Sequence, residues 1–319
     1  SAMLGRLLAK TSEERYTSTE QVIRDLCAAT DRPLPSETID IRESYLRAAS
    51  LVGREAELSQ LVSLLRQAVA SHGSAWLVGG ESGVGKSRLL DELRTLALVD
   101  GVLVLRGQAV SEGGRPYHVW CDVLRWLALL TEFSDLEAGV LKTLVPDLPD
   151  LRGRDVPDAP RLDPQAAQDR LLMVIENVFR RQSQPTLILL EDLHWARESL
   201  NVLARLNRSV SESPLLLIGT YRDDERPDLP SDLPGMKVLK LGRLQQEAVA
   251  ELSEAMLGAA GREPHVVDWL QRQTEGNPFF LVEVVRALAE ESGQLADIGG
   301  ATLPARIAAR GVQEIVQHR

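Results

Sequence analysis

The chain has 319 residues, of which 44% are hydrophobic, and this predicts a folded protein of about two domains. Its formal net charge of −10 argues against binding to nucleic acid or to an anionic membrane surface. Its two cysteines, Cys27 and Cys121, form neither a disulfide framework nor a metal-ligand spacing, and no apolar run approaches the roughly 20 residues of a membrane span, so we expect a cytoplasmic protein.

The first fifty residues read as accessory segments. Residues 1–3 (Ser-Ala-Met) look like the scar of a cleaved tag. Apolar residues at helical spacing predict two short helices within residues 4–30, and the polar, proline-bearing stretch 31–50 predicts a linker.

From residue 51 to about 243, short apolar runs alternate with amphipathic helical patterns. Uninterrupted apolar runs are typical of strands covered on both faces, so this region predicts an α/β fold with a parallel sheet. The expected strands are 75–79, 102–106, 186–190, 214–219 and 237–241, and the helices between them are 86–98, 117–130, 164–182 and 197–208. Residues 146–163, rich in Asp, Pro and Arg, are expected to form an irregular surface insertion.

Residues 80–87 read Gly-Glu-Ser-Gly-Val-Gly-Lys-Ser, the G-x-x-x-x-G-K-[ST] pattern of a phosphate-binding P-loop. The glycines let backbone N–H groups approach anionic oxygens, Lys86 supplies a charge for the β- and γ-phosphates, and Ser87 offers a hydroxyl to Mg²⁺. The loop lies between a predicted strand and a predicted helix, which is the expected setting. The predicted phosphate contacts are Gly80, Ser82, Gly83, Val84, Gly85, Lys86, Ser87 and Arg88.

Two acidic residues, Glu191 and Asp192, directly follow the predicted strand 186–190. A P-loop enzyme needs a carboxylate to hold Mg²⁺ through water and a group that polarises the attacking water, and this pair can supply both. The alternative interpretation is a strand end with two solvated acids.

Arg222 ends the next predicted strand, at the edge of the sheet where ligands of α/β proteins bind. There it could sense or stabilise a γ-phosphate. The alternative is a surface arginine paired with one of the acidic residues 223–225.

After residue 243 the strand signals stop, and helical patterns fill 244–257, 263–273 and 278–292. Pro278 suits the first turn of the last of these helices, and the residues alone predict helix initiation there with Phe279 and Phe280 in the core. A further helix is expected at 303–316.

Five motifs, in family order, together resemble the STAND class of AAA+-related P-loop ATPases. Two of them are the P-loop and the strand with its two acids, which continues as Leu193-His194-Trp195-Ala196. Residues 52–57 (Val-Gly-Arg-Glu-Ala-Glu) resemble the hhGRExE motif, whose backbone lies against adenine. Residues 220–222 resemble the sensor-1 arginine segment, and residues 276–278 the GxP motif, whose proline touches the base.

The resemblance implies a P-loop ATPase core at 51–243 and a helical lid at 244–298, with ATP or ADP and Mg²⁺ bound between them. It adds Val52, Gly53, Arg54 and Pro278 to the expected nucleotide contacts. By alignment, Glu191 takes the metal position with Ser87, and Asp192 the water-activating one. The order Glu then Asp departs from the usual Asp-first form, so this division of roles stays open, as does the role of Arg197, where relatives often have Asp.

The two ends resemble parts of other modules. Residues 4–30 resemble the last helices of a Ser/Thr protein kinase domain, and residues 299–319 the truncated start of a winged-helix subdomain. A kinase's own catalytic motifs are absent, so we do not expect kinase activity. The resemblance implies a fragment of a bacterial signalling protein, with flanking kinase and C-terminal sensor modules as partners and with nucleotide-dependent self-association.

The expected function is therefore a nucleotide-dependent signalling switch that hydrolyses ATP slowly. Two alternatives stay open. One is a DNA-associated AAA+ ATPase of the replication-initiator kind, against which the net charge argues. The other is a nucleotide-binding scaffold that does not hydrolyse, against which the two retained acids argue.

Overall fold

The computed structural model describes residues 51–111 and 115–292, together with Leu26. The expected tag scar at 1–3, kinase-like helices at 4–30 (apart from Leu26), linker at 31–50 and winged-helix start at 299–319 lie outside the described residues. Within the described residues, no helix has the length and hydropathy to traverse a lipid bilayer.

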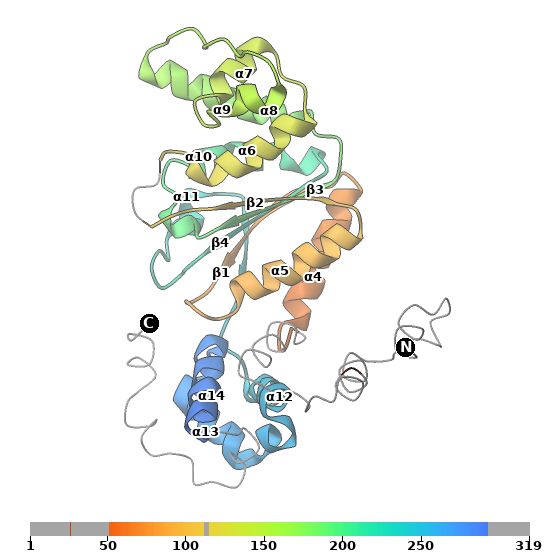
Figure 1. Ribbon diagram of the computed structural model, residues 1–319, viewed down its shortest axis with the longest axis vertical. Coiled ribbons are helices and arrows are strands. Elements are labelled where there is room, and N and C mark those ends of the chain that lie inside the picture. The colour runs from red at the N-terminus through yellow and green to blue at the C-terminus, as the bar shows by residue number, and fades with distance from the viewer. Residues whose placement is uncertain (1–25, 27–50, 112–114, 293–319) are drawn as a thin grey trace, which may run out of the picture. The chain divides into compact units, whose positions relative to one another are not determined.

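A five-stranded parallel sheet with the strand order β2-β3-β4-β1-β5 organises residues 51–243 (Figure 1). This confirms the predicted α/β fold. The strands are β1 (Ser74–Gly79), β2 (Leu103–Gln108), β3 (Thr186–Glu191), β4 (Leu215–Tyr221) and β5 (Lys237–Lys240).

Side chains of the central strands alternate between two apolar layers, because successive residues of a strand point to opposite faces. Leu187 and Leu189 of β3 pack with α4 (Glu55–Val69) and α5 (Lys86–Val99) on one face. Ile188 and Leu190 pack on the other face, in one apolar cluster with buried residues of three helices. These are α6 (His118–Leu130), α9 (Pro164–Arg180) and α10 (Leu200–Asn207) (Figure 1).

The expectation of an irregular surface insertion at 146–163 is wrong in part. Residues Leu148–Arg152 form the short helix α8, which packs against α6, and both Leu148 and Val156 are buried. These apolar side chains, scattered among prolines and charges, join the cluster on the α6 face. The other short elements between residues 51 and 243 are α7 (Asp135–Leu141), η2 (Leu193–Trp195), η3 (Val210–Glu212) and α11 (Leu229–Asp232).

Residues 246–292 form most of the expected helical lid (244–298), and they contain no strand. From here on, the helical lid means these residues. Its helices, close to the predicted ones, are α12 (Gln246–Leu257), η4 (Gly258–Arg262), α13 (Pro264–Thr274) and α14 (Pro278–Ser292). They enclose an apolar cluster of their own, separate from the two on the sheet. The prediction of Phe279 as a core residue is wrong, since 46% of it is exposed.

Candidate functional site

The predicted site segments meet at one edge of the sheet. The P-loop follows β1, Glu191 ends β3 just before Asp192, and Arg222 follows β4. These three strands are neighbours and run parallel, so their carboxyl ends lie together. This is the edge at which open α/β sheets bind ligands.

The P-loop has the geometry of an anion-binding turn. Gly83 and Gly85 have φ angles of 81° and 100°, which glycine adopts without a steric penalty, and Gly85 is the N-cap of α5. In the described part of the chain, the N–H groups of Gly83, Val84 and Gly85 have no hydrogen-bond acceptor. Free N–H groups at the start of a helix are suited to bind phosphate oxygens.

Every carbonyl of this loop, in contrast, already accepts a hydrogen bond. Lys86 Nζ donates to Gly80 O at 2.6 Å and to Glu81 O at 2.8 Å. The other four donors are Asn277 Nδ2 to Ser82 O (2.9 Å), Phe279 N to Gly83 O (3.3 Å), Arg54 Nη2 to Val84 O (3.1 Å) and Leu89 N to Gly85 O (3.0 Å). The loop therefore turns its acceptors toward the protein, while three of its N–H donors have no partner in the described part of the chain.

Lys86 lies at the foot of the loop with 9% of its surface exposed. Burial, followed by the nearby charge of Arg222, lowers the pKa of Lys86. A bound phosphate would offset both effects, because an anion favours the charged form of an ammonium group.

Glu191, 8% exposed, is held through both carboxylate oxygens. Its Oε2 accepts from Ser87 Oγ at 2.9 Å, so the structure joins the two residues predicted to hold metal. Its Oε1 accepts from Arg106 Nη2 on β2, and this hydrogen bond raises the pKa of Arg106. The guanidinium also contacts Asp91 Oδ1 at 3.1 Å.

No group of three or more His, Cys, Asp or Glu side chains placed to hold a metal ion is found among the residues that the structure describes. One hydroxyl and one carboxylate fit Mg²⁺, which usually keeps several waters and takes further ligands from a bound polyphosphate. The residues present therefore fit the predicted ion.

Asp192 is a non-glycine residue in the left-handed region, with a φ angle of 60°. Its N–H donates to Thr220 Oγ1 of β4 at 3.2 Å, and its carboxylate accepts from Gln108 Nε2 of β2 at 3.0 Å. Backbone conformations of this kind gather at functional sites.

The sequence interpretation missed Arg106 and Gln108. The strand was predicted at 102–106, whereas β2 is Leu103–Gln108, and its register sets Gln108 opposite Glu191. Two polar residues at i and i+2 lie on the same face of a strand, and this spacing is the signal that was available.

Arg222 is engaged by protein groups. Its Nη1 donates to Glu225 Oε1, and its guanidinium lies 5.5 Å from the centre of the Trp195 ring. The surface pairing expected as the alternative is therefore present. His194 Nε2 lies 3.5 Å from Glu225 Oε2, and burial lowers the pKa of His194.

The turn at Val52, Gly53 and Arg54 meets the lid. Gly53 packs so closely on Ala248 of α12 that a Cβ at Gly53 would lie 2.5 Å from the Ala248 Cβ. Arg54, 6% exposed, donates to Gly242 O as well as to the P-loop carbonyl of Val84.

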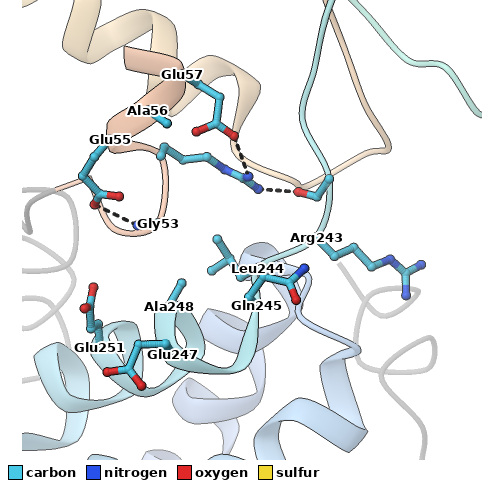
Figure 2. Close-up of a pocket in the computed structure, with 12 residues that line it drawn as sticks. Gly53, Glu55, Ala56, Glu57, Arg243, Leu244, Gln245, Glu247, Ala248 and Glu251 are labelled. Carbon is cyan, nitrogen blue, oxygen red and sulfur yellow. Dashed lines mark hydrogen bonds and ion pairs between the residues drawn. The ribbon is translucent and has the colours of Figure 1, made fainter. Parts of the chain in front are cut away.

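A pocket of about 490 Å³ opens between this turn and α12 (Figure 2). Gly53 and Arg54 line it, whereas Pro278 does not. Pro278 is instead the first residue of α14, whose N-terminal end contacts the P-loop. Of the other predicted residues, Arg88 lies on α5 with an ion-pair distance of 3.5 Å to Glu92.

Comparison with protein families matches residues 50–218 to a family described as an AAA ATPase domain. Residues 245–293 match a family described as a domain of unknown function. An uncharacterized protein of Rhizobium meliloti (strain 1021) is 26% identical over 267 residues, which are 75% of this chain and 25% of the relative. The chain therefore spans about a quarter of the length of that relative.

One solved structure shares this fold at low sequence identity. A chain of the Drosophila ORC bound to DNA superposes with a TM-score of 0.50 at 14% identity, covering 94% of this chain and 73% of that one. The Aeropyrum pernix ORC1 protein in complex with DNA gives a TM-score of 0.43 at 19% identity, over 77% of this chain and 62% of that one.

Proposed function

Since the chain belongs to the AAA ATPase domain family, we propose that it binds ATP or ADP with Mg²⁺ at the P-loop and hydrolyses ATP slowly. The observation that carries this proposal is the set of N–H groups at Gly83, Val84 and Gly85 that have no acceptor among the described residues, together with the buried Lys86. A loop that presents donors and an ammonium group suits a polyphosphate better than any neutral ligand.

In this proposal the loop residues 80–88 bind the phosphates, and Lys86 exchanges its two carbonyl partners for phosphate oxygens. Ser87 and Glu191 hold the metal, and the Ser87–Glu191 hydrogen bond of 2.9 Å supports their pairing. When bound, Mg²⁺ supplies positive charge to the β- and γ-phosphate oxygens.

Asp192 is assigned to the attacking water, because Gln108 and Thr220 hold it beside Glu191 and outside the contact with Ser87. Arg222 would contact the γ-phosphate once its hydrogen bond to Glu225 is exchanged. The need for this exchange supports slow hydrolysis.

The adenine is assigned to Val52, Gly53 and Arg54, with Pro278 contributing from the lid. Support comes from the STAND-like motifs and from the position of Gly53 and Arg54 at a pocket shared with α12. The same motifs support a signalling switch that self-associates with nucleotide. The kinase-like sequence of residues 4–30 supports its place in a larger protein with kinase and sensor modules.

Equilibrium dialysis of the protein against ATP or ADP in the presence of Mg²⁺ tests the proposal, because it measures how much nucleotide the protein binds. Lys86→Ala should weaken binding about 10- to 100-fold, since a hydrogen bond to a charged group contributes about 1.5–3 kcal/mol. Lys142→Ala, which removes a lysine paired with Asp158 on another part of the surface, should bind as the unchanged protein does. Equal binding by the Lys86 variant would contradict the proposed site.

A further inference from the structure

We propose that docking of the helical lid prepares the P-loop for phosphate, and that Asn277 is the positioning residue that couples the two. The inference rests on the proposed function, because the anion concerned is the phosphate of the nucleotide. Four groups carry it: the side chain of Asn277, the N–H of Phe279, and the carbonyls of Ser82 and Gly83.

Asn277 joins the lid to the loop through both ends of one side-chain amide. Its Oδ1 accepts from Phe279 N at 3.1 Å and from Phe280 N at 3.5 Å, which caps the start of α14. Its Nδ2 donates to Ser82 O at 2.9 Å. Only 2% of Asn277 is exposed, so water cannot readily replace either contact.

The lid contacts set the direction of the loop amides. The described residues contain no cis peptide bond, and in a planar trans peptide the C=O and the following N–H point in opposite directions. With Ser82 O held by Asn277, the N–H of Gly83 points away from the lid. With Gly83 O held by Phe279 N, the N–H of Val84 does the same. These are two of the unpaired donors of the proposed phosphate site.

Gly83 makes this docking sterically feasible. A Cβ at this position would lie 2.8 Å from Asn277 Oδ1 and 2.8 Å from the Phe279 Cβ. The start of α14 therefore occupies the space that a side chain would fill. The glycine serves the lid as well as the turn.

A second contact between loop and lid offers a matched comparison. Arg243 Nη2 lies 2.8 Å from Glu81 Oε2, and its Nη1 contacts Glu275 of the lid. All three side chains are more than a third exposed, and exposed ion pairs contribute little. We therefore expect the buried Asn277 contact to dominate the coupling. By linkage, bound nucleotide must favour the docked lid as strongly as the docked lid favours nucleotide.

The test uses two substitutions that keep the helix cap. Asn277→Ser keeps an N-cap acceptor but is too short to reach Ser82, and Asn277→Asp keeps the shape but faces the Ser82 carbonyl with a carboxylate. Losing a net hydrogen bond of about 0.5–1.5 kcal/mol should raise the Kd for ADP with Mg²⁺ about 2- to 12-fold in the Ser variant. The Asp variant should lose more, and Arg243→Gln less than either.

Hydrogen exchange provides a readout that a purely structural role would not change. In the unchanged protein, ADP with Mg²⁺ should slow exchange of the first α14 amides, including that of Phe279. In Asn277→Ser this nucleotide-dependent protection should be lost. The melting temperature without nucleotide should fall only by the few degrees that one hydrogen bond contributes.

The inference is overturned if both Asn277 variants bind ADP as tightly as the unchanged protein. It is also overturned if ADP with Mg²⁺ protects the first α14 amides of Asn277→Ser as strongly as those of the unchanged protein. Lys86→Ala separates this result from a failure of the proposed function: if that variant binds normally, the phosphate site itself is wrong. If Lys86→Ala loses binding and Asn277→Ser does not, only the coupling is wrong.

Discussion

The P-loop and the neighbouring sheet edge with Glu191, Asp192 and Arg222, which we call the acidic edge, differ in how far their groups are already free to bind a nucleotide. In the loop, the N–H groups of Gly83, Val84 and Gly85 have no acceptor among the described residues, and the carbonyls that would repel a phosphate are held by Arg54, Lys86 and the lid. At the acidic edge the reverse holds: Glu191 is bonded to Ser87 and Arg106, and Arg222 to Glu225.

This difference separates binding from hydrolysis. The loop backbone can receive phosphate with little rearrangement, because the N–H donors of Gly83, Val84 and Gly85 have no partner to give up within the described chain. Only the Lys86 side chain has to exchange its carbonyl partners for phosphate. Hydrolysis requires Glu191 and Arg222 to exchange protein partners for metal, water and phosphate. A preformed electrostatic site costs no reorganisation at the moment of reaction, and this edge is not preformed.

The largest expected effect is on the rate of ATP hydrolysis, and it comes from Asp192→Asn. Loss of a general base typically lowers the rate about 100- to 10,000-fold, and the amide can still accept the hydrogen bond from Gln108. Binding of ATP with Mg²⁺ should stay within about twofold, since it depends on the loop. Single-turnover hydrolysis with Asp135→Asn, an exposed acid paired with Arg154, as the control checks this. Undiminished hydrolysis would transfer the role to Glu191.

A smaller effect is expected from Glu225→Gln, which removes the charge that holds Arg222. An exposed ion pair contributes about 0.2–1 kcal/mol, so releasing it should increase the preference for ATP over ADP by up to about fivefold. Competition titrations of the two nucleotides measure this. An unchanged preference would mean that Arg222 does not contact the γ-phosphate.

The smallest expected effect is the pH dependence of stability that arises from His194. Burial lowers its pKa in the folded protein below the unfolded value of about 6.5. The stabilisation is therefore present above that unfolded value and is lost as the pH falls through the folded-state pKa. His194→Gln should flatten the decline between pH 7.5 and 5.5 in urea unfolding. If the stability of the variant declines as steeply as that of the unchanged protein, the pH dependence comes from carboxylates and not from His194.

The sequence predicted the sheet well because its central strands are apolar without interruption. Thr186–Glu191 and Leu215–Tyr221 are buried along their whole length, and a short apolar run of this kind is typical of a strand covered on both faces. Short elements such as α8 were missed, because five residues with two prolines nearby carry no periodic signal. Their burial comes from tertiary packing on α6.

Of the site, the sequence supplied the residues but not their partners. The P-loop, Glu191, Asp192 and Arg222 follow from motifs and strand ends. The contacts of Arg106 and Gln108 depend on the register between β2 and β3, which pattern alone does not determine. The Asn277–Ser82 contact joins residues 195 positions apart. The motif at residues 276–278 pointed only to Pro278, as a contact of the base.

The order Asn277-Pro278 has a consequence for the chemical ageing of the protein. Asparagine side chains deamidate when the backbone nitrogen of the following residue attacks the amide carbon and closes a five-membered ring. Pro278 has no N–H, so this route is closed at Asn277. The amide that joins the lid to the P-loop is therefore protected from slow conversion to aspartate over the lifetime of the molecule.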